Sequence, residues 1–296
     1  MKKLAVVLIL AAFVISNISA QIKIEYGSNP KAGKYINIGD IKVYYETYGK
    51  GEPLLLLHGN SGSIENFTDQ IPEFSKHFKV IAIDSRAQGR TTDSEKEITY
   101  ALMASDVSEL IDRLNLGKVN IVGWSDGGNI GLELAFSHPE KVLKVVTFGA
   151  NYTHENFLAP PDSAIMLPDD PLIKSSSAMM KRYGTAFERL SPDTTRKVII
   201  QKKLAELMEK YPNFTLAQLN TINVPFLIVV GDHDLIKINQ TVDLFTNLPK
   251  AQLFVVPGTS HIVPVENPEL INNEVIKFLK TPYRYIDRYY FFKIPK

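Results

Sequence analysis

A serine between two glycines carries the strongest chemical signal in the sequence. Residues 123–127 are Gly-Trp-Ser-Asp-Gly, directly after an apolar run that ends at Val122 and directly before a helix-like segment through Phe136. Glycines on both sides of a serine are typical of a sharp strand-to-helix turn, which lifts the hydroxyl clear of a sheet. Ser125 is therefore a candidate nucleophile. Without the strand before it and the helix after it, an ordinary glycine-rich turn would be the better interpretation.

A serine hydroxyl is a weak nucleophile at neutral pH, so it needs a general base, and a third group must orient that base. Two later segments offer such groups, because each follows a short apolar run typical of a buried strand. Residues 231–234 are Gly-Asp-His-Asp, and residues 258–261 are Gly-Thr-Ser-His. The interval between them has room for one helix and one strand. Two neighbouring parallel strands can then present both groups at the same edge of a sheet.

Two more motifs extend the pattern. Residues 58–59 are His-Gly after a further apolar run, and residues 84–91 are Asp-Ser-Arg-Ala-Gln-Gly-Arg-Thr. Together with the serine turn and the two later segments, these motifs resemble those of the α/β-hydrolase fold family, in its serine hydrolase, esterase-like branch. The resemblance covers residues 35–280, in the family's order of nucleophile, acid and histidine. In the second motif Ala87 and Thr91 replace the usual Gly and Ser, and this loop is expected to be structural.

The resemblance implies a role for each candidate residue. Ser125 is the expected nucleophile, His261 the general base and Asp234 the acid that orients it, with no metal and no organic cofactor required. The backbone N–H groups of Asn60 and Asp126 are the expected oxyanion hole. Asp232 is a rival for the acid. The alternative interpretation of His261 is an ordinary surface histidine. The alternative interpretation of residues 58–59 is an ordinary strand-exit turn.

Side chains beside these motifs allow more than one interpretation. The carboxylate of Asp126 could favour a cationic group on a substrate, pair with Arg86 or Arg90, or act as a helix N-terminal carboxylate. The candidates to line an apolar substrate pocket are Trp124, Phe67, Met166, Met179 and Met180. Each of these five could equally be an ordinary core residue.

The elements that must position these residues follow from the apolar pattern. A predicted hairpin, with strands at 35–38 and 41–48 and a turn at 39–40, comes first. From residue 53 on, short continuous apolar runs alternate with helical patterns, at 54–57, 80–83, 119–122, 143–148, 226–230 and 253–256. Such runs are typical of parallel strands buried on both faces. The sequence therefore predicts an α/β fold with a mostly parallel, doubly wound sheet and helices on both faces.

The alternation stops once, between residues 151 and 211, where no strand-like run occurs. The second half of this interval has a helical pattern, and Ser191 and Pro192 suit the cap and first residue of a helix. We expect an inserted helical lid at 151–211. The predicted hydrolase core comprises residues 21–150 and 212–280, and the aromatic, basic tail at 281–296 is expected to pack on it.

The first twenty residues resemble a secretory signal peptide: two lysines, an unbroken apolar run from Leu4 to Ile15, then short residues up to Ala20. An exported, periplasmic or secreted protein is expected. An uncleaved anchor is the alternative, although a helix over that run would be only about 18 Å long against a bilayer core of about 30 Å. The sequence has no cysteine, which excludes disulfides and thiolate metal sites.

Composition limits the partners and the function. Lys and Arg number 33 against 32 Asp and Glu, a net charge of +1, so no large electrostatic term favours nucleic acid or an anionic membrane. The expected activity is hydrolysis of a small carboxylic ester or lactone through an acyl-enzyme on Ser125. An amide, or a carbon–carbon bond beside a ketone, is the alternative substrate. A non-catalytic binding protein on the same fold is the alternative from another class.

Overall fold

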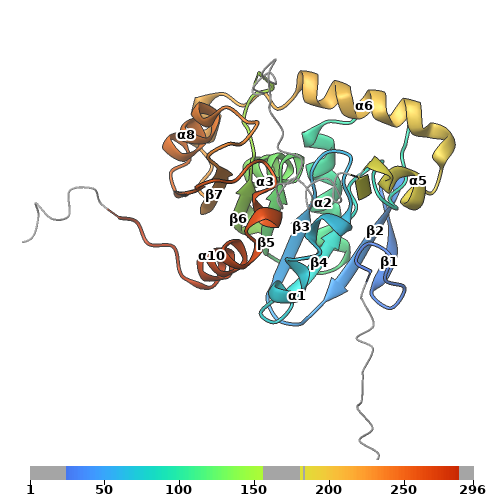
Figure 1. Ribbon diagram of the computed structural model, residues 1–296, viewed down its shortest axis with the longest axis horizontal. Helices are drawn as coiled ribbons and strands as arrows, with labels where there is room; N and C mark the ends of the chain where they lie inside the picture. Colours follow the sequence, from blue (N-terminus) through green and yellow to red (C-terminus); the bar gives the residue numbers. More distant parts are fainter. Residues whose placement is uncertain (1–24, 156–180, 183, 287–296) are drawn as a thin grey trace, which may run out of the picture.

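The computed structural model describes residues 25–155, 181–182 and 184–286. In this part of the chain a single sheet of eight strands lies between two layers of helices (Figure 1). The strand order is β1-β2-β4-β3-β5-β6-β7-β8. The strands are β1 (Gly33–Ile38), β2 (Ile41–Tyr48), β3 (Pro53–Leu57), β4 (Lys79–Ile83), β5 (Val119–Trp124), β6 (Val142–Phe148), β7 (Phe226–Gly231) and β8 (Ala251–Val256).

The sheet begins with the predicted hairpin and continues as a parallel sheet. β1 and β2 pair antiparallel around Gly39, whose φ of +49° suits the tight turn. β2 pairs antiparallel with β4, and every other neighbouring pair from β4 to β8 is parallel. The predicted fold class, an α/β fold with a mostly parallel sheet, is confirmed.

Helices cover both faces of the sheet. The α-helices are α1 (Ile71–Phe74), α2 (Tyr100–Arg113), α3 (Asp126–Ser137), α5 (Ala186–Leu190), α6 (Lys197–Lys210), α7 (Leu216–Leu219), α8 (Ile238–Asn247), α9 (Val263–Glu266) and α10 (Pro268–Lys280). Three short 3-10 helices are η1 (Ile64–Phe67), η2 (Pro139–Lys141) and η3 (Thr194–Arg196). α2, α3 and α8 contribute to one hydrophobic cluster, and α1 and α10 to the other.

The two clusters explain why the strand sequences are continuously apolar. Successive side chains of a strand point to opposite faces of the sheet. In β3, Leu55 and Leu57 therefore join the cluster with α2 and α3, whereas Leu54 and Leu56 join the cluster with α1 and α10. A strand buried on both faces needs an apolar residue at every position, which is the pattern that predicted it.

The described part of the inserted segment is helical, with α5, η3 and α6 between β6 and β7. The predicted start of its long helix was wrong. Ser191 ends α5 as its C-cap, and Asp193 caps η3 by accepting a hydrogen bond from the backbone N–H of Thr195, so α6 begins only at Lys197. The first half of the predicted lid, including Met166, Met179 and Met180, lies outside the described residues. A lid function for the segment stays a prediction.

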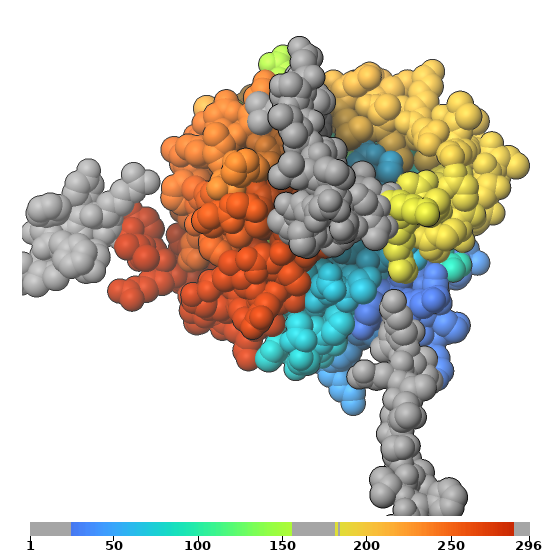
Figure 2. Space-filling model, viewed as in Figure 1, coloured from blue at the N-terminus to red at the C-terminus, as the bar shows by residue number. Residues whose placement is uncertain are grey.

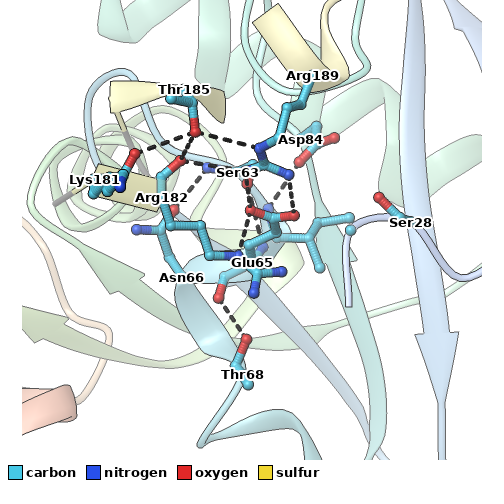
Figure 3. Close-up of polar contacts among 12 residues, drawn as sticks. Ser28, Ser63, Glu65, Asn66, Thr68, Asp84, Lys181, Arg182, Thr185 and Arg189 are labelled. Carbon is cyan, nitrogen blue, oxygen red and sulfur yellow. Dashed lines mark hydrogen bonds and ion pairs between the residues drawn. The ribbon is translucent and has the colours of Figure 1, made fainter. Parts of the chain in front are cut away.

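Ion pairs with two buried carboxylates join this segment to the core. Glu65 in η1 accepts hydrogen bonds from Arg182, at 3.0 Å, and from both terminal nitrogens of Arg189, at 3.0 and 2.7 Å (Figure 3). Asp93 pairs with Arg196 at 2.7 Å and Lys203 at 3.2 Å. The side chains of Glu65 and Asp93 are 1% and 2% exposed. The segment, in yellow and gold in Figure 2, is therefore held to the core by ion pairs with these two buried carboxylates.

The sequence carried an unused signal for this attachment. Basic residues recur at seven-residue intervals from Arg182 through Arg189, Arg196 and Lys203 to Lys210, the last of which pairs with Glu97 at 3.1 Å. A repeat of seven returns to the same side of a helix after about two turns. The repeat indicates one basic side of the segment, but nothing in it identifies the carboxylates on the core.

The two ends of the chain add little to this architecture. The predicted signal peptide at 1–20 lies outside the described residues. Within the predicted tail, Tyr285 and Ile286 are 72% and 68% exposed, so the expectation that the tail packs on the core is wrong for them. Residues 287–296 lie outside the described part. None of the described helices has the length and hydropathy needed to cross a membrane.

Candidate active site

The candidate residues all leave the sheet at the carboxyl ends of parallel strands. Ser125 follows β5, Asp234 follows β7, His261 follows β8 and Asn60 follows β3. These strands lie in the order β3-β5-β6-β7-β8, with one intervening strand. In parallel α/β sheets this edge is where loops from different strands meet and ligands bind.

Ser125 occupies a strained turn, as its glycine neighbours predicted. Its φ is +54° and its ψ is −117°, a backbone conformation that residues other than glycine rarely adopt. A Cβ atom on Gly123 would lie 2.2 Å from the carbonyl oxygen of Gly127, and a Cβ on Gly127 would lie 1.9 Å from that of Leu57. Only glycine fits at both positions, because the backbone of the turn and of β3 are in direct contact.

The structure joins His261 to Asp234 and not to Asp232. His261 Nδ1 lies 2.8 Å from Asp234 Oδ1, and the Asp234 side chain is 1% exposed. Asp234 Oδ1 also accepts a hydrogen bond from the backbone N–H of Ile236 at 2.9 Å. This carboxylate can hold the imidazole in one orientation and stabilise a positive charge on it.

Asp232 has a different set of partners. Its Oδ1 accepts hydrogen bonds from the backbone N–H groups of Gly258, at 2.8 Å, and Thr259, at 3.3 Å, and it contacts the exposed His233. The hydrogen bond with His233 lowers its pKa. Asp232 therefore ties the loop after β7 to the loop after β8.

Gly149, which sequence reasoning missed, makes room for the Asp234–His261 pair. It follows β6, the strand between the serine and the acid, and has a φ of +58°. A Cβ atom at this position would lie 2.6 Å from His261 Nδ1 and 2.8 Å from Asp234 Oδ2. A glycine directly after an apolar strand, at the edge where the other motifs meet, is the signal that could have identified it.

The serine hydroxyl and the imidazole lie at the same edge without a hydrogen bond between them. Among the described residues, no hydrogen bond of the Ser125 hydroxyl is formed, and the imidazole is held from its other side by Asp234. The indole Nε1 of Trp124, next to the serine, donates to the carbonyl oxygen of His261 at 3.0 Å. This bond fixes the backbone of His261 beside the turn that carries Ser125.

The loop after β3 lies against the serine. A Cβ atom on Gly59 would be 3.2 Å from the Cβ of Ser125 and 3.9 Å from its Oγ. The backbone N–H groups of Asn60 and Asp126 have no acceptor among the described residues. Two amides without acceptors near a serine can bind an oxyanion, which is the role that the resemblance implies for them.

The side chains of these two residues are hydrogen-bonded to each other. Asn60 Nδ2 donates to Asp126 Oδ2 at 2.9 Å and to the carbonyl oxygen of Leu204 in α6 at 3.3 Å. Tyr100 donates its hydroxyl to Asp126 Oδ1 at 2.7 Å. Burial raises the pKa of Asp126, and the hydrogen bonds from Tyr100 and Asn60 oppose that rise. The network therefore connects the two residues that carry the free amides through the buried carboxylate of Asp126.

The suggested pairing of Asp126 with an arginine was wrong. Arg86 binds Asp106 and Asp40 instead, and Arg90 donates to the backbone carbonyl oxygen of Gly27. The alternative of a helix N-terminal carboxylate fits, because Asp126 is the first residue of α3.

His58 and Asp84 support the loop after β3. His58 is buried, its Nδ1–H donates to the carbonyl oxygen of Gly59 at 2.8 Å, and its Nε2 accepts from the backbone N–H of Ser85 at 3.0 Å. Burial lowers the pKa of His58 to about 4. Burial raises the pKa of Asp84 to about 7, although it accepts hydrogen bonds from the backbone N–H groups of Ile64 and Arg90.

Trp124 and Phe67 are buried in the hydrophobic core of the described residues. Both belong to the cluster with α1 and α10, and their side chains are 4% and 0% exposed. They match the alternative interpretation of ordinary core residues. Within the described part of the chain, no group of three or more histidine, aspartate or glutamate side chains could hold a metal ion.

The comparisons with known proteins agree with this architecture. The family model described as the alpha/beta hydrolase fold matches residues 52–173. The 2-hydroxy-6-oxo-6-(2'-aminophenyl)hexa-2,4-dienoic acid hydrolase of Metapseudomonas resinovorans is 26% identical over 83% of this chain and 90% of its own. The (E)-2-((N-methylformamido)methylene)succinate hydrolase of Acinetobacter baylyi is 25% identical over 81% of this chain and 94% of its own.

Solved structures extend the likeness over the described strands and helices. A meta-cleavage product hydrolase of Pseudomonas fluorescens superimposes with a TM-score of 0.70, covering 85% of this chain and 98% of its own at 20% sequence identity. At that sequence identity the structural similarity supports the fold alone. With the serine on its strained turn and the sheet order described above, the chain has the α/β-hydrolase fold.

Proposed function

We propose that this protein is a serine hydrolase that cleaves a small carboxylic ester or lactone through an acyl-enzyme on Ser125. The observation that carries the proposal is the 2.8 Å contact between His261 Nδ1 and the buried carboxylate of Asp234, at the sheet edge that also carries the strained serine turn. This contact leaves His261 Nε2 free for the serine proton. The hydrogen bond between Ser125 and His261 forms when substrate binds, since such bonds often tighten only in the substrate complex.

The chemistry follows from these contacts. His261 accepts the proton of Ser125 as the hydroxyl oxygen attacks the carbonyl carbon, and Asp234 stabilises the imidazolium that results. The free amides of Asn60 and Asp126 donate hydrogen bonds to the oxyanion of the tetrahedral intermediate. His261 then protonates the leaving alcohol, and the same residue deprotonates a water molecule that releases the acid from Ser125.

Labelling by a fluorophosphonate probe, together with turnover of p-nitrophenyl acetate and of a small δ-lactone, tests the proposal. We expect stoichiometric labelling of the wild-type protein and none of Ser125→Ala. Labelling that persists in Ser125→Ala would remove Ser125 as the nucleophile. A wild-type protein that neither labels nor turns over any of these substrates would favour a non-catalytic binding protein.

A second candidate reaction uses the same residues on a carbon–carbon bond beside a ketone. The relative from Metapseudomonas resinovorans is by name a hydrolase of a 6-oxo dienoic acid, whose ketone offers Ser125 a carbonyl carbon to attack. The relative from Acinetobacter baylyi is by name a hydrolase of a formamido compound, which favours an amide-like bond. Comparing kcat/KM for the p-nitrophenyl ester, a 2-hydroxy-6-oxodienoate and an N-substituted formamide decides among the three.

We further propose that the activity is located outside the cytoplasm, on the strength of the signal-peptide pattern at residues 1–20. Cell fractionation and N-terminal sequencing test this. A mature chain that begins at Gln21 in the exported fraction is the expected result. A full-length chain in the cytoplasm would contradict export, and one in the membrane fraction would favour an uncleaved anchor.

A further inference from the structure

A cleft separate from the proposed acyl site lies between the start of α2, the end of α3 and the chain that follows α6. Its volume is about 330 Å³, which is within the range of small-molecule pockets. Glu133, in its wall, is seven residues after Asp126 in the same helix, and therefore about 10 Å further along the helix axis. The cleft is thus distinct from the edge that carries Ser125.

Aromatic rings form much of the cleft wall. Four rings line it, those of Tyr100, Phe136, Tyr211 and Phe214. The rings of Phe136 and Phe214 meet edge to face, with centroids 5.6 Å apart and planes at 87°. Phe136 is 36% exposed, which is high for a phenylalanine on a helix that is mostly buried. The faces of aromatic rings attract cations because of their quadrupole.

Glu133 supplies the charge in this cleft. Its side chain is half-buried and, among the described residues, makes no hydrogen bond and no ion pair. The imidazole of His138, which acts on Glu133 through its charge when it carries one, lies 3.5 Å from Glu140. Burial raises the pKa of Glu133, as expected for a carboxylate without a close counter-charge.

Three other polar side chains of the wall already have partners, while the hydroxyl of Tyr211 has none among the described residues. Thr99 accepts a hydrogen bond from the backbone N–H of Leu102, Asn213 is bonded to His154 and Lys210, and Gln218 caps α7 together with Thr215. A ligand therefore meets one free carboxylate, one free hydroxyl and several aromatic side chains. A cation suits the carboxylate and the rings, because it neutralises the carboxylate and gains from each ring that it faces.

From this arrangement we propose that the cleft binds a small organic cation, of the quaternary ammonium or alkylammonium class. An inorganic cation would lose its hydration shell against apolar rings, whereas an alkylated ammonium group buries its methyl groups there. A neutral ligand of the same shape leaves Glu133 without a counter-charge. The inference stands apart from the proposed hydrolase function, because no residue of the cleft is assigned a step in that reaction; Tyr100 contacts the site only through its hydrogen bond to the Asp126 carboxylate.

Isothermal titration of the purified protein with choline and with 3,3-dimethylbutan-1-ol, its neutral isostere, tests the proposal. We expect choline to bind at least tenfold more tightly than the isostere, since one charge contact and cation–π contacts of about 0.5–1 kcal/mol each distinguish the two. Choline that binds no better than the isostere, or not at all, overturns the assignment. Ser125→Ala should bind choline like the wild type. The choline measurement therefore tests this proposal even if the hydrolase proposal fails.

Two variants locate the binding. Glu133→Gln keeps the shape of the side chain and should lose at least tenfold in choline affinity. Phe136→Ala should weaken choline more than its isostere, because only choline loses a cation–π contact. Glu140→Gln, a nearby exposed carboxylate, is the matched control and should bind like the wild type. Full choline affinity in Glu133→Gln, or amide chemical-shift changes that avoid residues 100, 133 and 211–214, would assign the binding to another surface and contradict the proposal.

Discussion

Two aspartates two positions apart have different hydrogen-bond partners because of where each carboxylate points. Asp234 is buried and holds His261, while Asp232 is partly exposed and accepts backbone hydrogen bonds from the loop after β8. Both follow the same strand, so their position at the sheet edge does not distinguish them. The conformation of the loop after Gly231 does, since it turns Asp234 toward the imidazole.

The first prediction separates these two carboxylates. Asp234→Asn is expected to lower kcat by roughly 10³- to 10⁴-fold, because an amide cannot stabilise the imidazolium and can favour the wrong tautomer. Asp232→Asn should change kcat by less than about tenfold, since it alters only a structural contact. Steady-state kinetics on a p-nitrophenyl ester measure both. The opposite ranking would transfer the acid role to Asp232.

The second prediction concerns the side chain of Asn60. Asn60→Ala removes the side-chain hydrogen bond to Asp126, which holds the two residues with free backbone amides in fixed relative positions. We expect kcat to fall by about ten- to a hundredfold, a smaller decrease than the loss of a whole oxyanion donor causes. KM should change little, because the oxyanion forms only after binding. Ser61→Ala is the control, since Ser61 is exposed and bonds only the side-chain oxygen of Asn60. Unchanged kcat in Asn60→Ala would exclude this positioning role.

At the scale of elements, the inserted segment depends on charge for its attachment to the core. Glu65 follows the loop that carries Asn60, so the two arginines that bind it connect the segment to the proposed oxyanion hole. The arginines lower the pKa of Glu65 despite its burial. The ion pairs therefore outweigh the cost of burying the carboxylate. The stability they contribute is present above the ordinary pKa of a glutamate and is lost as the pH falls below it.

The third prediction tests this attachment. Glu65→Gln is expected to speed amide hydrogen exchange in α5 and α6 by about tenfold, because the segment opens locally more often when its charged contact is lost. Glu188→Gln is the matched control, since Glu188 pairs with Lys197 at the exposed surface and such pairs contribute little. Equal exchange rates in α5 and α6 for wild type and Glu65→Gln would show that the ion pairs do not hold the segment.

At the scale of the whole molecule, two buried groups make opposite contributions to the pH dependence of stability. The pKa of His58 falls from 6.5 to about 4 on folding, so its contribution is complete above pH 6.5 and is lost as the pH falls toward 4. The pKa of Asp84 rises from 3.8 to about 7, so its contribution is complete below pH 3.8 and is lost as the pH rises through 7. Because the two contributions change in opposite directions with pH, they partly cancel in the unfolding free energy of the wild type.

The fourth prediction exposes the contribution of His58. His58→Gln keeps an acceptor for the backbone N–H of Ser85 but has no proton to gain. Between pH 7 and pH 4 the unfolding free energy of the wild type should therefore fall by about 3 kcal/mol more than that of the variant. Urea unfolding at several pH values measures the difference. His233→Gln, at an exposed histidine, should follow the wild type; parallel profiles for His58→Gln and wild type would contradict the assignment.

The sequence by itself determined the sheet, the order of its parallel strands along the chain and the strained turn at Ser125. These features depend on local patterns, since a strand buried on both faces must be apolar throughout and a crowded turn must have glycines. The resemblance favoured Asp234 over Asp232, but only the tertiary structure decided the contact between Asp234 and His261, that Trp124 and Phe67 lie in the core, and that Asp126 binds Tyr100 and Asn60. These outcomes depend on loop conformation and on side chains far apart along the chain, and no local pattern encodes either.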